Sequence, residues 1–226
     1  VLNPTKENPE NICEGLMAIG EAACVSVHGA NRLGTNSLID LIVFGKAASI
    51  TAKEKVKPNS AKLSLRQSST DLILERFDNI RYNKGELTTG AIRQSMQEIM
   101  QSKCAVFRNK ELISKGIEEF GNVETSMKNI NVKDKSLIFN TDLTEALELN
   151  NLIAQSKVTL HSALYRTESR GAHAREDFKE RDDKNWLSHS LSWLNEDGKV
   201  SLDKRSVHMN TLSNHAQSIP PKKRVY

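Results

Sequence analysis

The sequence predicts an α+β chain that is mainly α-helical, with a helical bundle between two segments of different texture. Three observations support this prediction. No proline occurs between Pro58 and Pro220, which permits long helices. Apolar residues recur at three- and four-residue spacing through the middle of the chain, as on one face of a helix. Late in the chain, apolar and polar residues alternate on both sides of an Asp-Gly pair, which is typical of a β-hairpin.

Composition excludes several classes of protein. The 226 residues include 32 Lys and Arg against 28 Asp and Glu, for a net charge of +4, and 38% are hydrophobic. These values exclude a collagen or a coiled coil. No apolar run reaches the roughly 18–20 residues that a membrane span needs. Basic and acidic residues are interleaved, so no nucleic-acid partner is predicted. Because residue 1 is valine, we expect either that an N-terminal segment was removed or that the chain is the tail of a longer protein.

The first 36 residues are rich in glycine and small side chains. The apolar run in residues 15–21 predicts a short buried strand that ends at a glycine-bounded turn. A loop at 28–34 follows, and Asn36 or Ser37 is expected to cap the next helix. The apolar residues of that helix are Leu38, Leu41, Ile42, Phe44 and Ala48. Residues 49–59 contain several lysines and a proline and are predicted to form a solvated linker.

Residues 60–165 are predicted to form an antiparallel helical bundle with short connections. The fourth helix is expected to begin at Asp142, with Glu145 completing a capping box. The four helices are marked by Leu63, Leu72, Leu74 and Phe77, less regularly than the rest; by Ile92, Met96, Ile99 and Met100; by Leu112, Ile113, Ile117 and Phe120; and by Leu149, Leu152, Ile153, Leu160 and Leu164.

The remaining residues divide into a charged loop, a hairpin and a tail. The charges from Arg166 to Asp183 nearly balance, and two interpretations stay open: a buried or interfacial ion-pair network, or a solvated loop. Alternation from 186 to 194, a turn at Asp197-Gly198 and a return strand from Val200 predict a hairpin. The polar, basic tail from 217 is expected to lie on the surface.

Neither the cysteines nor the histidines predict a metal site. The cysteines are odd in number and widely spaced, so we expect free thiols in a reducing compartment. The histidines show no HxxH or HExxH spacing, and His173 has no nucleophile placed near it by spacing. The other residues concerned are Cys13, Cys24, Cys104, His28, His161, His189, His208 and His215.

The glycine-rich loop and the helix start after it form the strongest candidate site. A helix N-terminus presents free N–H groups and the positive end of a dipole, which favour an anion. Glu21 could accept hydrogen bonds from ribose hydroxyls, and the Arg32 guanidinium could hold a carboxylate with two parallel hydrogen bonds. The alternative is a packed turn in which Glu21 and Arg32 only pair with each other.

The same segment carries a long and specific resemblance. Residues 15–40, GLMAIGEAACVSVHGANRLGTNSLID, closely resemble the flavoproteins of the succinate dehydrogenase and fumarate reductase family. RQSMQ at 93–97, FNTD at 139–142, ESRGAHAREDF at 168–178 and the ending PPKKRVY support the resemblance in the same order. L-Aspartate oxidase shares the glycine-arginine loop, whereas the AHARED motif favours the dehydrogenase. The sequence departs from many bacterial members at Lys179, where they have proline, and at Thr35, where they often have glycine.

The resemblance implies that the chain is the C-terminal portion of such a flavoprotein. Residues 1–55 would close the FAD-binding domain, 56–165 would form a helical bundle domain, and 166–226 a small domain with the charged loop and hairpin. FAD is the implied cofactor. The implied roles are FAD binding for Glu21, Ser37 and Leu38, and substrate binding for Arg32. No catalytic residue is assigned, because the proton-shuttle arginine and the covalent FAD attachment site are expected upstream, and the chain alone is expected to be inactive.

The implied activity is oxidation of succinate to fumarate in the tricarboxylic acid cycle. Electrons would pass through FAD to an iron–sulfur subunit and, through membrane anchor subunits, to quinone, as in respiratory complex II. The implied location is the cytoplasmic face of the bacterial inner membrane or, alternatively, the matrix face of the mitochondrial inner membrane. The alternative functions are fumarate reductase, L-aspartate oxidase and a non-enzymatic helical interaction module.

Overall fold

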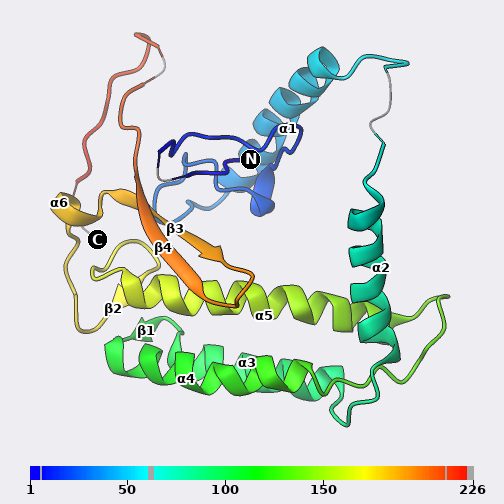
Figure 1. Ribbon diagram of the computed structural model, residues 1–226. Helices are drawn as coiled ribbons and strands as arrows, with labels where there is room; N and C mark the ends of the chain where they lie inside the picture. The colour runs from blue at the N-terminus through cyan, green and yellow to red at the C-terminus, as the bar shows by residue number, and fades with distance from the viewer. Residues whose placement is uncertain (6, 61–63, 212, 223–226) are drawn as a thin grey trace.

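The computed structural model describes residues 1–5, 7–60, 64–211 and 213–222. An N-terminal segment that contains helix α1 (Asn36–Lys55) lies beside a β-hairpin, and the hairpin covers one side of a helical bundle (Figure 1). The predicted fold class, mainly α with one hairpin, is confirmed. The predicted boundaries between domains, at 55 and 165, stay a prediction.

The bundle supplies the hydrophobic core. Its helices are α2 (Gln67–Tyr82), α3 (Thr89–Lys103), α4 (Lys110–Met127) and α5 (Thr141–Tyr165). The last three contact one another, and the hairpin packs on α5 (Figure 1). Most marker residues predicted for α3, α4 and α5 are in contact with this core. The buried core residues include Ile92, Met96, Ile113, Phe120, Val123, Ile130, Val132, Leu143, Leu149, Ile153 and Leu160.

Three helices of the bundle begin at a side-chain cap. The side-chain oxygens of Thr88, Asn109 and Asn140 each accept a hydrogen bond from the N–H three residues on, at 2.8–3.2 Å. The predicted capping box of Asp142 and Glu145 is therefore wrong, because the cap of α5 lies two residues earlier. Asp142 instead accepts a backbone hydrogen bond of 2.7 Å from the connection between α4 and α5, which it ties to the start of α5. That connection, residues 128–140, is longer than the short turns predicted.

Helix α2 packs against α5 but buries none of its residues. Leu72 and Leu74 are 66% and 55% exposed, and Phe77 is partly buried against the core. Leu63, the first residue of the predicted pattern, lies outside the described residues. The irregular spacing of these apolar residues thus corresponds to a helix at the edge of the bundle.

The connection between α2 and α3 runs parallel to part of the connection between α4 and α5 and pairs with it. Leu87 donates its backbone N–H to Asn129 at 3.0 Å and accepts one from Asn131 at 2.8 Å. A Cβ atom on Gly85 would lie 2.0 Å from the carbonyl oxygen of Asn129, so only glycine fits where the two connections meet.

The predicted strand at 15–21 is wrong. These residues form no strand, and a short 3-10 helix, η1 (Gly20–Ala22), ends the run. Leu16 and Met17 are 54% and 43% exposed. An apolar run becomes a strand only when a partner strand satisfies its backbone, and the described residues offer none here.

Helix α1 begins earlier and ends later than predicted. Thr35 occupies its cap position with φ +71° and no side-chain cap bond, so the prediction that Asn36 or Ser37 caps the helix is wrong. Residues 49–55, predicted as part of a linker, continue the helix. Two of the lysines that suggested a linker, Lys53 and Lys55, lie in its last turn, where positive charge suits the helix dipole.

The C-terminal part contains the predicted hairpin and a pairing that the sequence did not predict. Its elements are β2 (Ala174–Arg175), α6 (Asp183–Trp186), β3 (Ser188–Leu194) and β4 (Val200–Ser206). Strand β3 pairs antiparallel with β4 around a turn at 195–199, where Gly198 has φ +77°. Strand β2 pairs in parallel with β1 (Phe107–Arg108). This pairing joins the charged loop to the segment just before α4.

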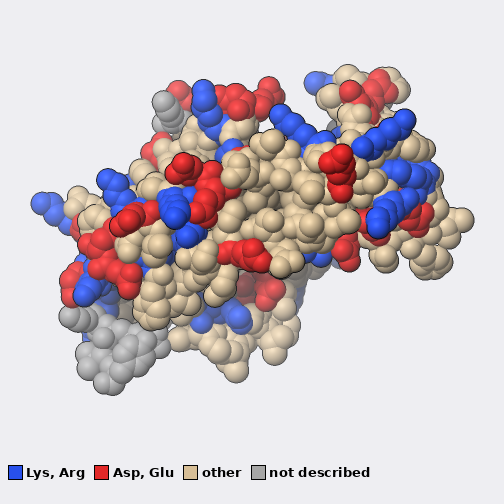
Figure 2. Space-filling model, turned by 90° about the horizontal axis from the view of Figure 1, so that it is seen from below, with Lys and Arg blue, Asp and Glu red and all other residues tan. Residues whose placement is uncertain are grey.

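Surface charge is mixed in sign. Figure 2 shows Lys and Arg interspersed with Asp and Glu over the face that it presents. Among the helices that the structure describes, none is both long and apolar enough to cross a bilayer.

Candidate functional site

Three of the four predicted site residues lie together at the N-terminus of α1. The guanidinium of Arg32 donates a hydrogen bond through Nη1 to Oγ of Ser37, in the first turn of the helix. Leu38 follows Ser37 and is 66% exposed. No ion pair joins Arg32 to Glu21 in the part of the chain that the structure describes, so the packed-pair alternative is not what the structure shows. Arg32 thus keeps most of its donors for a ligand.

Glu21 lies on η1, which packs directly against α1. Gly20 is buried with φ +63°, and a Cβ atom there would come within 2.2 Å of Cδ2 of Leu41. Glycine is therefore what lets η1 lie close to the helix. The carboxylate of Glu21 is exposed, and within the described chain it is free to accept hydrogen bonds from a ligand.

A buried acid fixes the loop that carries Arg32. Asp40 alone is buried among the residues of α1, all of which are described, and its Oδ2 lies 2.8 Å from Nε2 of His28. At one end of the loop, Oγ of Ser26 lies 3.2 Å from Nε2 of His189 on β3. Neither contact is predictable from the sequence beyond the presence of the histidines, because each joins residues of different elements.

The charged loop forms a buried network, which decides between its two interpretations. Glu168 is fully buried and accepts hydrogen bonds from Arg166, from Arg170 at 2.7 and 2.9 Å, and from the backbone N–H of Asp182 at 2.8 Å. Burial alone would raise the pKa of Glu168, but the hydrogen bonds from Arg170 and Asp182 outweigh it and the pKa is lowered. The carboxylate therefore stays ionised.

Arg175 joins this network to both α5 and α4. Its side chain is 1% exposed. Nη1 donates to the carbonyls of Ala163, Leu164 and Arg166 at 2.9–3.1 Å, where α5 ends, and the other two nitrogens donate to both oxygens of Asp177 at 2.8 Å. The hydrogen bond from Arg175 lowers the pKa of Asp177 to about 2. Asp177 also accepts the backbone N–H of the first residue of α4 at 2.9 Å.

His173 is not available as a general base. Its Nε2 lies 3.0 Å from the carbonyl of Arg166, and its Nδ1 lies 2.7 Å from a guanidinium nitrogen of Arg108. Burial lowers the pKa of His173, and the nearby guanidinium charges lower it further. The ring is therefore neutral at pH 7, donating through Nε2 and accepting through Nδ1, and it serves the network rather than a substrate.

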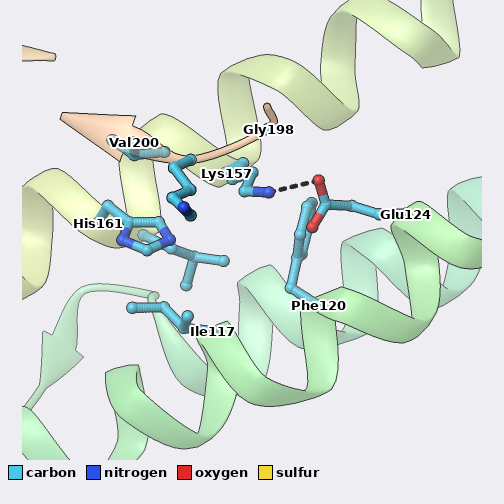
Figure 3. A pocket seen from close by; sticks show the side chains of 9 residues that line it. Ile117, Phe120, Glu124, Lys157, His161, Gly198 and Val200 are labelled. Carbon is cyan, nitrogen blue, oxygen red and sulfur yellow. Dashed lines mark hydrogen bonds and ion pairs between the residues drawn. The ribbon is translucent and has the colours of Figure 1, made fainter. Parts of the chain in front are cut away.

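A cavity of about 390 Å³ lies between α4, α5 and the hairpin turn (Figure 3). Ile117, Phe120 and Leu160 line its apolar side, and Lys157 donates to Glu124 at 2.6 Å across its rim. Burial and the charge of Lys157 lower the pKa of His161. None of the predicted site residues lines this cavity.

Comparison with known proteins places these features in a family. The family model described as "Fumarate reductase flavoprotein C-term" matches residues 93–226, and one described as "FAD binding domain" matches residues 3–38. The chain is 50% identical over 220 residues to the succinate dehydrogenase flavoprotein subunit of Rickettsia bellii. The aligned region covers 97% of this chain and 37% of that relative. It is 48% identical to the mitochondrial succinate dehydrogenase flavoprotein subunit of Oryza sativa, and that alignment covers 97% of this chain and 35% of the relative.

Solved structures agree with the sequence comparisons. An Escherichia coli quinol fumarate reductase variant superposes with a TM-score of 0.83 at 35% identity, over 94% of this chain and 36% of that one. The Sdh1 complex of Mycobacterium smegmatis in the apo form, at 24% identity, shares the fold with a TM-score of 0.75; the match covers 88% of this chain and 33% of that one. The chain thus spans little more than a third of the curated relatives that it matches. It belongs to the flavoprotein family of succinate dehydrogenase and fumarate reductase.

Proposed function

We propose that the chain provides the substrate-binding arginine and part of the flavin site of a flavoprotein that oxidises succinate to fumarate. One observation carries the proposal: Arg32 is held by Ser37 at the start of α1, within the segment that matches an FAD-binding family model. The 50% identity to a succinate dehydrogenase flavoprotein subunit supports this substrate over others.

Arg32 would bind one carboxylate of succinate. One guanidinium nitrogen donates to Ser37, which leaves Nε and Nη2 for a bidentate pair with the substrate. A bidentate clamp fixes orientation as well as affinity, so the carbon–carbon bond to be oxidised would lie at a fixed place against the cofactor. We assign the removal of the substrate proton to no residue of this chain.

The residues around α1 fit the flavin cofactor. Its first turn has no side-chain cap. The N–H of Leu38 makes a long hydrogen bond of 3.3 Å to the Thr35 carbonyl, and the N–H of Ser37 is available to a negatively charged ligand atom. The exposed carboxylate of Glu21 can accept hydrogen bonds from ribose hydroxyls. FAD, when bound, supplies the hydride acceptor. Residues 1–55 would thus close the FAD-binding domain, with the bundle at 56–165 and the small domain at 166–226 beside it.

The proposed partners follow from the relatives. One matching structure is a quinol–fumarate reductase with menaquinol molecules, and we propose that the parent flavoprotein likewise exchanges electrons with a quinone, through an iron–sulfur subunit and membrane anchors. It would lie peripherally on the inner membrane of a bacterium or a mitochondrion. A fumarate reductase is the second candidate, because the E. coli fumarate reductase flavoprotein subunit is 37% identical over 98% of this chain.

A chimera tests the proposal. The matching region of the Rickettsia bellii subunit would be replaced with this chain, and flavin absorbance and succinate-dependent dye reduction would be measured. We expect bound flavin and succinate oxidation. Arg32→Lys should raise the KM for succinate about tenfold to a hundredfold, because hydrogen bonds to charged groups contribute about 1.5–3 kcal/mol. Arg76→Lys, at an exposed arginine that bonds Asn151, is the matched control and should leave KM unchanged.

Other results would point elsewhere. Fumarate reduction without succinate oxidation would favour the reductase, and a folded chimera without flavin would favour the interaction module. Normal succinate kinetics in Arg32→Lys would remove the substrate role of Arg32.

A further inference from the structure

The loop that carries Arg32 rests on the charged loop through one close backbone contact. Gly171 has φ +60°, and a Cβ atom on it would lie 2.4 Å from the carbonyl oxygen of Ala30 and 2.6 Å from its carbonyl carbon. Two independent requirements therefore call for glycine at 171: the left-handed backbone and the absence of a side chain. Ala30 is two residues before Arg32 along the chain.

Gly171 itself sits in a rigid turn. Arg170 and His173 exchange both backbone hydrogen bonds across it, at 2.8 and 3.1 Å. The side chain of Arg170 is anchored on buried Glu168 and on Asp183. Because every charged side chain around the turn is paired in the described structure, the turn is a fixed support and not a mobile tip.

The Arg32 loop is otherwise held only on either side of Ala30. Before it, Ser26 contacts His189 and His28 contacts Asp40, and after it Arg32 bonds Ser37. No backbone hydrogen bond to another segment is made by described residues 28–34. The position of the middle of the loop is thus set by its contact with Gly171.

We propose that Gly171 is a positioning residue, whose turn sets where the Arg32 guanidinium stands relative to the substrate carboxylate. The proposal rests on the proposed function. A methyl group at 171 must move the backbone of Ala30 by about 1 Å to reach ordinary van der Waals contact at 3.4 Å or more. Displacement of a substrate clamp by about 1 Å can cost on the order of a hundredfold in rate.

The test compares two glycine substitutions in the same chimera. Gly171→Ala places a Cβ atom against the Ala30 backbone. Gly198→Ala is the matched control: φ there is also positive, +77°, but the atom nearest to an added Cβ is the flexible end of Lys157, at 3.9 Å. Both variants should lose similar stability from a side chain at positive φ. Only Gly171→Ala should raise the KM for succinate and the inhibition constant of malonate, by about tenfold to a hundredfold, while flavin content stays normal.

A double-mutant cycle with Arg32→Lys gives a readout that general destabilisation would not produce. If both changes act on one clamp, their effects on kcat/KM should fall well short of additive. Gly171→Ala alone could fail to retain flavin. In that case the double variant Gly171→Ala/Ala30→Gly is compared with Ala30→Gly, because glycine at position 30 lets the loop shift. A higher KM for succinate in the double variant than in Ala30→Gly supports the proposal as well.

The outcomes separate the two proposals. A wild-type chimera that binds flavin but does not oxidise succinate refutes the proposed function. An active wild type in which Gly171→Ala matches Gly198→Ala within twofold in KM refutes the positioning role alone, and full additivity with Arg32→Lys does the same.

Discussion

Arg175→Ala is expected to destabilise the chain more than any other change in the charged loop. The side chain is 1% exposed and makes five hydrogen bonds, three to carbonyls at the end of α5 and two to Asp177. Alanine takes the guanidinium donor from the carbonyls of Ala163 and Leu164, leaves the Arg166 carbonyl with His173 alone, and leaves the Asp177 carboxylate without its cation. Lysine cannot replace the planar guanidinium, because its three N–H donors all diverge from a single nitrogen atom.

The magnitude follows from these contacts. Lowering the pKa of Asp177 from 3.8 to about 2 corresponds to roughly 2 kcal/mol, which we reduce to about 1–2 kcal/mol because the carboxylate is 29% exposed. The three carbonyls lose a charged donor, and removing one member of a buried pair costs about 3–5 kcal/mol in total. We therefore expect Arg175→Ala to lower the free energy of unfolding by about 3–5 kcal/mol, and Arg175→Lys by at least half of that.

Urea unfolding of the 226-residue chain, followed by circular dichroism at pH 7, measures this loss. The matched control is Arg181→Ala in the same loop, where the Arg181–Asp183 pair at 2.8 Å is 31% and 38% exposed on its two side chains. That control should cost about 0–1 kcal/mol. A loss below about 1 kcal/mol for Arg175→Ala would refute the reasoning, since it would mean that water replaces the guanidinium without penalty.

Three further predictions concern single positions. Thr35→Gly should stabilise the chain by about 0.5–1 kcal/mol, because a β-branched residue at φ +71° is strained and glycine is not; the urea midpoint measures the gain. Gly85→Ala should destabilise it by about 2 kcal/mol or more, because its Cβ would lie 2.0 Å from the Asn129 carbonyl; a melting temperature close to wild type would contradict this. The stabilisation from Asp177, whose folded pKa lies below its unfolded value, should be present above pH 3.8 and be lost as the pH falls toward 2, and Asp177→Asn should remove this part of the acid-unfolding curve.

Local patterns predicted the helices that bury a full apolar face. The spacing of Ile92 and Met96 on α3, and of Ile113 and Phe120 on α4, reflects contacts that recur every turn, and all four side chains are buried. The pattern on α2 was irregular because that helix buries no residue. The apolar run at 15–21 was misassigned because strand formation depends on a partner that the run itself does not contain.

The candidate site was predictable only in part. Arg32 and Ser37 lie close in the sequence, so the motif that contains them also brings them together. The support that Gly171 gives to Ala30 was not predictable, because nothing in the charge pattern of the 166–183 loop says which surface its turn meets. The same holds for Arg175, whose partners are backbone carbonyls that have no sequence signature.

Contacts between segments far apart in the sequence determine when the N-terminal segment can fold. Arg205 on β4 donates two hydrogen bonds to Glu10, at 2.6 and 2.9 Å, and His189 on β3 contacts Ser26. These pairs close very long loops, which form late compared with the local contacts of the bundle. On the ribosome, the first 35 residues emerge before the strands that hold them exist. The loop around Arg32 therefore completes its contacts only after His189 on β3 has been made, and a ligand that needs the completed loop would bind after that point.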